Sequence, residues 1–513
     1  MKKQLTIELS PFDEESELKK RAAKKIGIKN ADGLKIKIAK KSIDARHKSD
    51  IKIIYNVIVS DEDEKLPEKV YERLTAAHSV AVVGAGPAGL FCALTLARHG
   101  IKPIVFERGE RVEERTKTVN AFFDGGELNT SSNVQFGEGG AGAFSDGKLN
   151  TQVNSPVIKE VLQDFVKFGA PSDILYLSKP HIGSDNLPVV VKNIRNEIIS
   201  LGGEFYFSTK INSLVQKNGC ACGVKTEDGR VFDADSVVLA IGHSARDTFF
   251  SLLASGVFME QKEFAVGVRV EQLQSRINLE RYGEKFANAK SLPPADYKLV
   301  SHPSTRGVFT FCMCPGGVVV PAASEEGETV VNGMSNYKRD GINANSAVIC
   351  QVLKQDFLSD SPLAGVMLQR EIERKTFLAA GDYKAPVQLA LDFINGVPTK
   401  CLNGVLPTYR RGFEFFTLEK LFPEAVSENL KAGLFDMDKK LKGFASDGAV
   451  LTGSETRTSS PVRITRNENF ESVSLKNLYP CREGCGYAGG IASAAADGVK
   501  VAEAVFNKLR KLL

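Results

Sequence analysis

Three glycines and one acidic residue have the spacing that recognition of a dinucleotide requires. Gly84, Gly86 and Gly89 follow a short apolar segment, residues 80–83, and Glu107 stands 23 residues beyond Gly84. The three glycines permit a tight turn, leave room for a pyrophosphate and let a helix pack closely on the preceding strand. The helix N-terminus offers free N–H groups to phosphate, and Glu107 can accept hydrogen bonds from an adenosine ribose. The pattern predicts a dinucleotide-binding βαβ unit.

The same G-x-G-x-x-G pattern occurs twice more, without the flanking elements of the first copy. The copy at 137–142 follows the polar residues 129–133, and the copy at 484–489 opens the last helix with no strand or acid after it. We interpret both as accessory glycine turns whose N–H groups can face an anion or a carbonyl. The acid after the one complete fold disfavours the 2′-phosphate of NADP. A C-terminal turn that can return to the same site favours FAD over NAD.

Apolar periodicity divides the chain into four segments. We predict an N-terminal α+β module at 1–76, for which a ferredoxin-like fold is one option. The first part of the nucleotide-binding domain follows at 77–257, then a cap or substrate domain at 258–455 and the C-terminal part of the nucleotide-binding domain at 456–513. The predicted helices are 14–26, 157–169, 192–201 and 491–512. The predicted strands are 4–9, 34–39, 51–59, 204–207 and 236–241, with a β-meander at 211–232 and a linker at 61–67.

At these residues the sequence resembles the glutathione-reductase-type FAD-binding fold, and it is most similar to a bacterial family of FAD-dependent dehydrogenases. The likeness is carried by VVGAGPAGLFCALTLARHG, NVQFGEGGAGAFSDGKLNT, FCMCPGGVVVPAASE, ETRTSSPVRI and EGCGYAGGIASAAADG. It implies an α/β fold in which an FAD-binding Rossmann domain carries an inserted α+β cap domain and a small N-terminal α+β domain. It implies no particular substrate.

The resemblance also implies which residues hold the cofactor. The ADP half would contact Gly84, Gly86, Pro87, Ala88, Gly89 and Glu107, with Arg108 and Arg115 reaching adenosine or phosphate. The pyrophosphate and flavin would pass Gly139, Gly140 and Ala141, and the backbone of Ile211 would contact adenine. Ala240 and Gly242 would belong to the second glycine turn of the fold, and Gly490 and Ile491 would face the flavin. Such flavoproteins usually carry Gly-Asp near the C-terminus. Glu483, before Gly484, is the expected substitute here, although Cys481 and Arg482 depart from the smaller residues of the pattern.

Catalytic residues are harder to predict because the flavin itself performs the redox step. Cys312 and Cys314 are candidates for a redox thiol pair near the flavin, with a structural or substrate-lining role as the alternative. Arg457 and Arg463 can clamp a carboxylate or phosphate, or form ordinary salt bridges. His243 follows the Gly242 turn and is a weaker candidate for a place beside the cofactor. The cysteines and six histidines lack the paired spacing of metal ligands, so we predict no metal site.

Composition limits the classes of protein that fit. The 513 residues are 42% hydrophobic and 25% charged, with a net charge of +5, which is ordinary for a soluble globular chain. Nine cysteines without an export signal favour reduced thiols and a cytoplasmic location. Residues 79–97 are apolar enough to suggest a membrane span, but their glycines and proline fit a strand–turn–helix better, so we predict no membrane span.

Positive charge is concentrated near the N-terminus. Residues 19–52 contain thirteen Lys or Arg against three Asp. This stretch is a solvated face or a docking surface for an acidic partner or RNA. The absence of interleaved aromatic residues makes nucleic acid the less favoured partner.

These observations favour an FAD-dependent oxidoreductase that acts on a small organic substrate in the cap by hydride transfer at the flavin. The chain has no second complete Rossmann unit, so NAD(P)H is expected at most as a transient reductant. Two alternatives remain at this point: a non-catalytic FAD-binding scaffold or sensor, and an RNA-modifying flavoprotein that docks through its basic N-terminal module.

Overall fold

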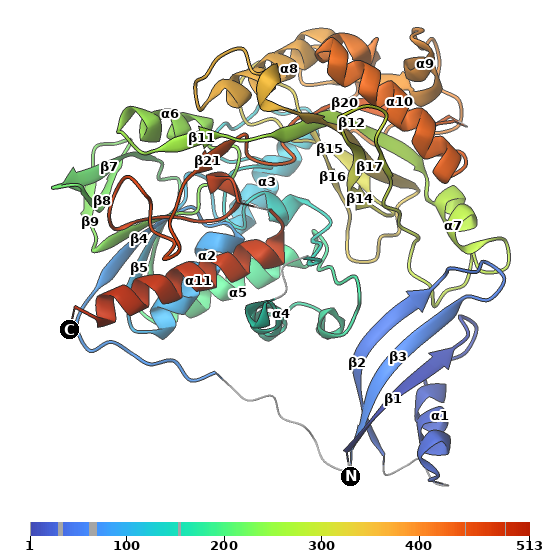
Figure 1. Ribbon diagram of the computed structural model, residues 1–513, viewed down its shortest axis with the longest axis horizontal. Coiled ribbons are helices and arrows are strands. Elements are labelled where there is room, and N and C mark those ends of the chain that lie inside the picture. Colours follow the sequence, from blue (N-terminus) through green and yellow to red (C-terminus); the bar gives the residue numbers. More distant parts are fainter. Residues whose placement is uncertain are drawn as a thin grey trace.

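The computed structural model describes residues 2–28, 34–60, 69–151, 155–446, 448–487 and 489–512. Figure 1 shows a parallel sheet with its helices at the lower left, a second sheet with helices above it, and the N-terminal module at the lower right. The predicted linker at 61–67 lies outside the described residues. Among the residues that are described, no helix has the length and apolar character needed to cross a membrane.

The nucleotide-binding part is built on a five-stranded parallel sheet of order β22-β10-β4-β5-β6. Its strands are β4 (Ser79–Val83), β5 (Lys102–Phe106), β6 (Glu204–Tyr206), β10 (Ser236–Leu239) and β22 (Leu478–Pro480). The helices α2 (Pro87–Arg98), α4 (Pro156–Lys167), α5 (Leu187–Ser200) and α11 (Ile491–Arg510) share one hydrophobic core with one face of this sheet. The expected Rossmann-type α/β arrangement is confirmed.

The opposite face of the parallel sheet is covered by the predicted β-meander. It consists of β7 (Ile211–Lys217), β8 (Cys220–Thr226) and β9 (Val231–Asp233), and it shares a core with α6 (Arg246–Ala254). Helix α3 (Val112–Phe123) follows β5. The sheet is therefore buried on both faces, which explains why β4 reads as a continuous apolar run.

Helix α2 is enclosed between the sheet and α11 (Figure 1). Every residue from Ala88 to Ala97 is buried. A Cβ at Gly498 of α11 would lie 2.1 Å from the Ala88 carbonyl oxygen, so the two helix backbones touch. A helix that is apolar on all sides is expected in such a place, and this explains the membrane-like composition of residues 79–97.

A seven-stranded sheet of order β13-β14-β17-β12-β20-β18-β19 forms the cap. Its strands are β12 (Phe264–Leu273), β13 (Val300–Ser301), β14 (Val308–Cys314), β17 (Asn343–Val352), β18 (Ala385–Leu389), β19 (Phe413–Phe415) and β20 (Val450–Glu455). Two smaller two-stranded sheets pair β11 (Met259–Gln261) with β21 (Val462–Ile464) and β15 (Val318–Pro321) with β16 (Val331–Met334). The cap helices are α7 (Gln274–Tyr282), α8 (Ala364–Ala380), α9 (Ala390–Asn395) and α10 (Glu424–Lys440).

The central cap strand β12 has two different faces. Val266, Val268 and Val270 belong to the same hydrophobic core as Leu430 and Leu434 of α10. Because side chains alternate along a strand, the residues between these valines, Arg269 among them, point away from α10. This alternation brings a buried cation to the side of the cap that faces the nucleotide-binding part.

The N-terminal module has the predicted strand–helix–strand–strand order. Strands β1 (Lys2–Leu9), β2 (Lys35–Asp44) and β3 (Lys52–Ser60) form an antiparallel sheet of order β1-β3-β2, with α1 (Glu17–Ile26) beside it. The module packs on the cap, where the Phe12 and Phe286 rings stack with centroids 5.4 Å apart. Its core therefore merges with the core of the cap.

Two predicted elements differ from the structure by five residues at one end, more than the other predicted elements do. The helix predicted at 192–201 begins at Leu187, because Pro188 stands in its first turn, where proline is tolerated, and Leu187, Val190 and Val191 face the core. The strand predicted at 34–39 continues to Asp44 through a β-bulge between Ile38 and Lys40. A bulge shifts the alternation that the prediction relied on.

Candidate functional site

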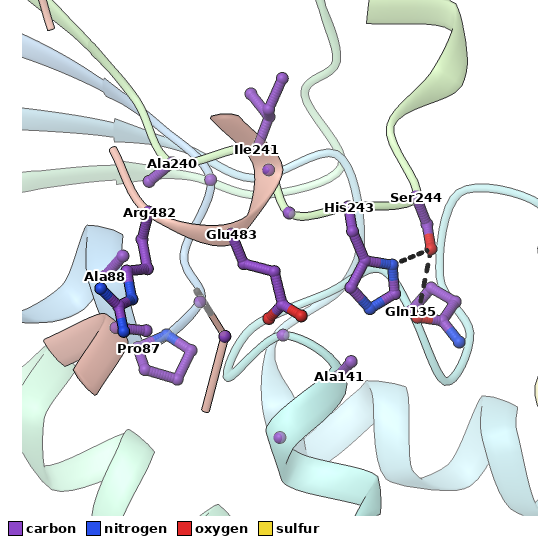
Figure 2. A pocket seen from close by; sticks show the side chains of 18 of the residues that line it. Pro87, Ala88, Gln135, Ala141, Ala240, Ile241, His243, Ser244, Arg482 and Glu483 are labelled. Carbon is purple, nitrogen blue, oxygen red and sulfur yellow. Dashed lines mark hydrogen bonds between the residues drawn. The ribbon is translucent and has the colours of Figure 1, made fainter. Parts of the chain in front are cut away.

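One cavity of about 870 Å³ lies between the nucleotide-binding part and the cap. Most of the residues singled out from the sequence as cofactor ligands line it. They are Gly84, Gly86, Pro87, Ala88, Glu107, Arg108, Gly140, Ala141, Ile211, Ala240, Gly242, Glu483, Gly484, Gly490 and Ile491. Figure 2 shows how residues from the α2 turn, the β10 turn, the glycine loop and the C-terminal turn surround this space.

The turn between β4 and α2 explains the three glycines of the first motif. Gly84 has φ +104°, and a Cβ there would lie 2.3 Å from the Ala240 carbonyl oxygen. A Cβ at Gly89 would lie 1.9 Å from the Gly84 carbonyl oxygen, so this glycine is needed for close helix–strand packing. Gly86 differs, since the nearest atom to its Cβ would be 3.8 Å away. Its missing side chain leaves open space at the cavity wall rather than relieving a clash.

Glu107 lies at the carboxyl end of β5 and lines the cavity. Its carboxylate accepts hydrogen bonds from the N–H groups of Ala85 (2.9 Å), Gly109 (3.0 Å) and Gly137 (3.0 Å). These bonds fix the carboxylate beside the glycine turn. Arg108, the next residue, is held by Asp247 at 2.9 Å and also lines the cavity.

Arg115 corrects one expectation. It is fully buried, does not line the cavity, and donates to the carbonyl oxygens of Asn133, Val134, Gly137, Glu138 and Gly140. Its guanidinium thus fixes the glycine loop from behind instead of reaching adenosine or phosphate. Gly89 and Gly139 also lie behind the cavity wall, where the Gly139 N–H donates to the Ala85 carbonyl.

The C-terminal turn contributes an acid at the expected place. Burial raises the pKa of Glu483 to about 7, against the lowering effect of the Arg482 and Lys262 charges. Figure 2 shows its carboxylate pointing into the cavity towards the His243 ring. Burial, with the nearby Arg457 and Arg246 charges, lowers the pKa of His243 to about 3, so this imidazole is neutral. His243 Nδ1 lies 2.9 Å from Ser244 Oγ.

Arg482 was noted in the sequence only as a departure from the usual pattern. It has φ +54° and lines the same cavity as Pro87 and Ala88 at the start of α2, which are labelled near it in the view of Figure 2. Its Nε is buried and has no hydrogen-bond partner among the described residues. The Asp497 and Glu483 charges act on this guanidinium, but its buried N–H without an acceptor suits a further negatively charged group. The α2 turn, which lines the same cavity, is where a diphosphate is expected.

A second helix N-terminus opens into the same cavity. Gly490, with φ +101°, precedes α11, and Ile491, Ser493 and Ala494 of its first turn line the cavity. The cavity therefore combines two helix N-termini, an acid at the end of β5 and a buried cation. These residues fit FAD, with its adenosine and diphosphate near α2 and its flavin near α11.

The cap wall of the cavity carries the thiol candidate. Phe311, Cys312, Asn332 and Glu455 line it, and Cys314 is buried behind them. Lys148, which was not singled out from the sequence, lines the cavity close to these thiols, with its Nζ 4.0 Å from Cys314 Sγ. All nine cysteines lie within the described residues and none forms a disulfide.

The two arginine candidates have different places. Arg457 lines the cavity, but it forms a salt bridge with Glu373 of α8, with its Nη2 at 2.6 Å and its Nε at 3.0 Å from the carboxylate oxygens. Of the two roles considered from the sequence, Arg457 therefore has the ordinary salt bridge. Arg463 also lines the cavity, is exposed, and lies over the Tyr487 ring at 5.5 Å from the centroid. Only Arg463 of this pair presents an exposed cation at the cavity.

Three carboxylates near Arg457 have the proximity of metal ligands. The ligand atoms of Glu325, Glu328 and Glu373 lie within 4.8 Å of one another. Arg246 contacts Glu328 at 2.9 Å and Glu373 at 2.7 Å, and Arg457 contacts Glu373 as well. Guanidinium groups thus fill the positions that a cation would need.

Family models match three parts of the chain. Residues 263–458 match the FAD-dependent protein, C-terminal domain-like family, and residues 82–137 match the NAD(P)-binding Rossmann-like domain. Residues 1–60 match a domain of unknown function.

Similar proteins cover different shares of the chain. A protein of Clostridium beijerinckii described as uncharacterized is 48% identical and covers 98% of both chains. The small chain of glutamate synthase [NADPH] of Escherichia coli is 38% identical over 17% of this chain and 18% of its own. The crystal structure of glycine oxidase from Bacillus cereus covers 84% of this chain and 95% of its own, at 12% identity and a TM-score of 0.37, a likeness too low to bear on function.

Proposed function

Because this chain belongs to the FAD-dependent oxidoreductases, we propose that it oxidises or reduces a small organic substrate by hydride transfer at FAD bound in the cavity. The observation that carries this proposal is the continuity of the cavity, which runs from Gly86 and Glu107 to Asn332 and Glu455 of the cap. A substrate between cap and cofactor would share one continuous cavity with the cofactor. When bound, FAD supplies the redox chemistry.

The chain's own residues have separate tasks in this proposal. Glu107 and the α2 turn hold the adenosine and the diphosphate, Arg482 neutralises phosphate charge, and the α11 N-terminus faces the flavin. The cap strands exclude water and orient the substrate. Electrons come from the substrate, from a protein carrier, or from NAD(P)H acting transiently over the flavin.

An anaerobic visible spectrum of the purified protein, before and after addition of NADH or NADPH, tests the proposal. A bound-flavin band that bleaches with a nicotinamide identifies a reductase. A stable band that bleaches with a panel of small organic reductants identifies a substrate dehydrogenase. A flavin that no donor reduces supports a scaffold or sensor, and protein without flavin overturns the proposal.

Gly86→Ala sharpens the test of the cofactor site. The added methyl group meets no protein atom closer than 3.8 Å, so the fold is kept, but the methyl group occupies the approach to the helix N-terminus. We expect loss of flavin from a protein whose circular dichroism is unchanged. A variant that retains flavin at the wild-type ratio would place the diphosphate elsewhere.

A further inference from the structure

The cap wall brings a thiol and a carboxyl group together through one arginine. Arg269 of β12 donates from Nη2 to the Cys312 carbonyl oxygen at 2.7 Å and from Nη1 to Glu455 Oε2 at 2.8 Å. Arg269 is fully buried, whereas Cys312 and Glu455 both line the cavity. The guanidinium thus fixes the two cavity-lining residues relative to each other.

The backbone at Cys312 has a shape suited to this placement. The pairing of β14 with β17 is interrupted between Phe311 and Cys314, and Cys312 has φ +44°. A bulge with one residue in the left-handed region turns a side chain away from its regular position, and non-glycine residues adopt this region mainly where the surroundings require it. In a regular strand Cys312 and Cys314 would point the same way, but here only Cys312 lines the cavity.

The surroundings of the thiol pair favour a thiolate at Cys312. The neighbouring Cys314 thiol, followed by the positive charges of Lys148 and Arg269, lowers the pKa of Cys312 although burial opposes this. The Cys314 thiol itself donates to the Cys312 carbonyl oxygen at 3.3 Å. Arg269 Nη2 lies 3.9 Å from Cys314 Sγ, and Lys148 Nζ lies 4.0 Å from it. The titratable groups that interact electrostatically with Cys312 are Cys314, Lys148, Arg269, Asp146, Glu455 and Glu483.

The pKa of Glu455 is shifted in the opposite direction to that of Cys312. Burial raises its pKa to about 7, and the Cys312 charge raises it further while Arg269 lowers it. Near neutral pH the cavity wall therefore presents a thiolate and a carboxyl group that keeps its proton in a large share of molecules. A nucleophile beside a proton donor with a pKa near ambient pH is an arrangement for general-acid-assisted addition.

We propose that Cys312 and Glu455 act as nucleophile and proton donor towards a small carbonyl substrate, an aldehyde or a conjugated ketone, bound against the cap wall. The inference rests on the proposed function, since it assigns the substrate class of the same cavity. Cys312 Sγ forms a bond to the electrophilic carbon, the π pair of the substrate moves to its oxygen, and the Glu455 proton passes to the resulting anion. No oxidant or reductant is consumed in this step.

Two electrophiles, one of which requires a proton donor, distinguish the role of Cys312 as nucleophile from that of Glu455 as proton donor. Iodoacetamide loses iodide when a thiolate attacks and needs no proton, whereas methyl vinyl ketone must be protonated after the thiolate adds. We expect Cys312 of the flavin-loaded protein to react with both at pH 6, at least roughly 10-fold faster than the exposed Cys401, as peptide mass spectrometry measures. Cys312→Ser abolishes this labelling, and Cys401→Ser leaves it unchanged.

Glu455→Gln is the decisive variant. It removes the proton donor and one negative charge near the thiolate, so iodoacetamide labelling should proceed at least as fast, while methyl vinyl ketone addition should slow by about 100-fold. Equal slowing of both reagents, or a Cys312 that reacts no faster than Cys401, would overturn the proposal. These labelling rates do not depend on turnover by the enzyme. If the flavin is reducible but Cys312 is unreactive, only the inference about Cys312 and Glu455 is refuted. If Cys312 is reactive but no donor reduces the flavin, only the proposed redox function is refuted.

Discussion

Two buried charge clusters adjoin the same cavity and differ in how their charges are matched. In the arginine–carboxylate cluster, Arg246 and Arg457 surround Glu373, with Glu325 and Glu328 beside them. Although burial opposes ionisation, the Arg246 and Arg457 charges hold the pKa of Glu373 far below its usual range. Each charge in this cluster has a partner inside the protein, as a structural ion-pair network requires.

The thiol cluster consists of Cys312, Cys314, Lys148, Arg269 and Glu455. Its cations have carboxylate partners, Asp146 for Lys148 at 2.9 Å and Glu455 for Arg269 at 2.8 Å. The Cys314 sulfur is matched less closely, since the two cations lie 3.9 Å and 4.0 Å from it, and the pKa of Glu455 is raised. Buried groups whose pKa values are shifted in opposite directions beside an open cavity are typical of chemistry. A carboxyl group with a raised pKa occurs in both clusters, at Glu328 and at Glu455, so what distinguishes the thiol cluster is a nucleophile, Cys312, at the cavity wall.

The largest expected effect is loss of stability when the arginine–carboxylate cluster is broken. Glu373→Gln removes the fully buried carboxylate that Arg246 and Arg457 share and leaves Arg457 with Glu325 only at 3.5 Å. It should destabilise the fold by about 3–5 kcal/mol in urea unfolding. The matched control is Glu371→Gln on the same helix, which removes only an exposed pair with Lys375 and should change stability by less than about 0.5 kcal/mol. Equal effects of the two changes would erase the distinction between the clusters.

A pH-dependent effect should follow from Glu455. Its folded-state pKa of about 7 lies above the ordinary value of 4.5, so the folded protein binds more protons than the unfolded chain between these pH values. Wild-type stability should therefore fall, relative to Glu455→Gln, by roughly 1–3 kcal/mol as pH rises from 4.5 to 8. Urea unfolding at several pH values measures this, and Glu424→Gln, at the exposed start of α10, should show no such trend. A rise in relative wild-type stability would contradict the assigned direction.

Removing the thiolate itself should cost little stability. Cys312 is half-buried at the cavity, so Cys312→Ser should change the unfolding free energy by less than about 1 kcal/mol. Cys350→Ser is the comparison, because Cys350 is fully buried in β17 and an added hydroxyl there should cost about 1–3 kcal/mol. If Cys312→Ser were the more damaging change, the thiol cluster would have a structural role.

The smallest expected effect concerns metal ions. Because guanidinium groups already contact Glu328 and Glu373, adding Mg²⁺ or Zn²⁺ should leave the melting temperature unchanged. A bound ion at 100 times its dissociation constant would stabilise the protein by about 2.7 kcal/mol, which a thermal scan detects easily. A clear upward shift that Glu325→Gln abolishes would show that the carboxylates can release their arginines.

The sequence predicts the cofactor half of the site better than the cap half for a physical reason. Gly84, Gly86, Gly89 and Glu107 lie within one βαβ unit, where local spacing determines geometry. Lys148 and Glu455 reach the cavity through contacts between strands and loops far apart in the chain, which leave no local pattern. For Arg115 the sequence predicts a contact that the structure does not show. Its charge suits a phosphate, but its guanidinium donates hydrogen bonds to five carbonyl oxygens of residues 133–140 instead.

The contact between the turns at Gly242 and Gly484 also bears on how the chain is made. A Cβ at Gly484 would lie 2.6 Å from the Gly242 backbone, and β22 and α11 complete a sheet and a helix layer begun by β4 and α2. During synthesis the N-terminal elements emerge first and must wait for the final segment. The nucleotide pocket therefore closes only after α11, which lies far along the chain from α2, has been made. Cofactor capture then has to wait for both parts of the nucleotide-binding sheet, and a variant that lacks α11 should be recovered without flavin.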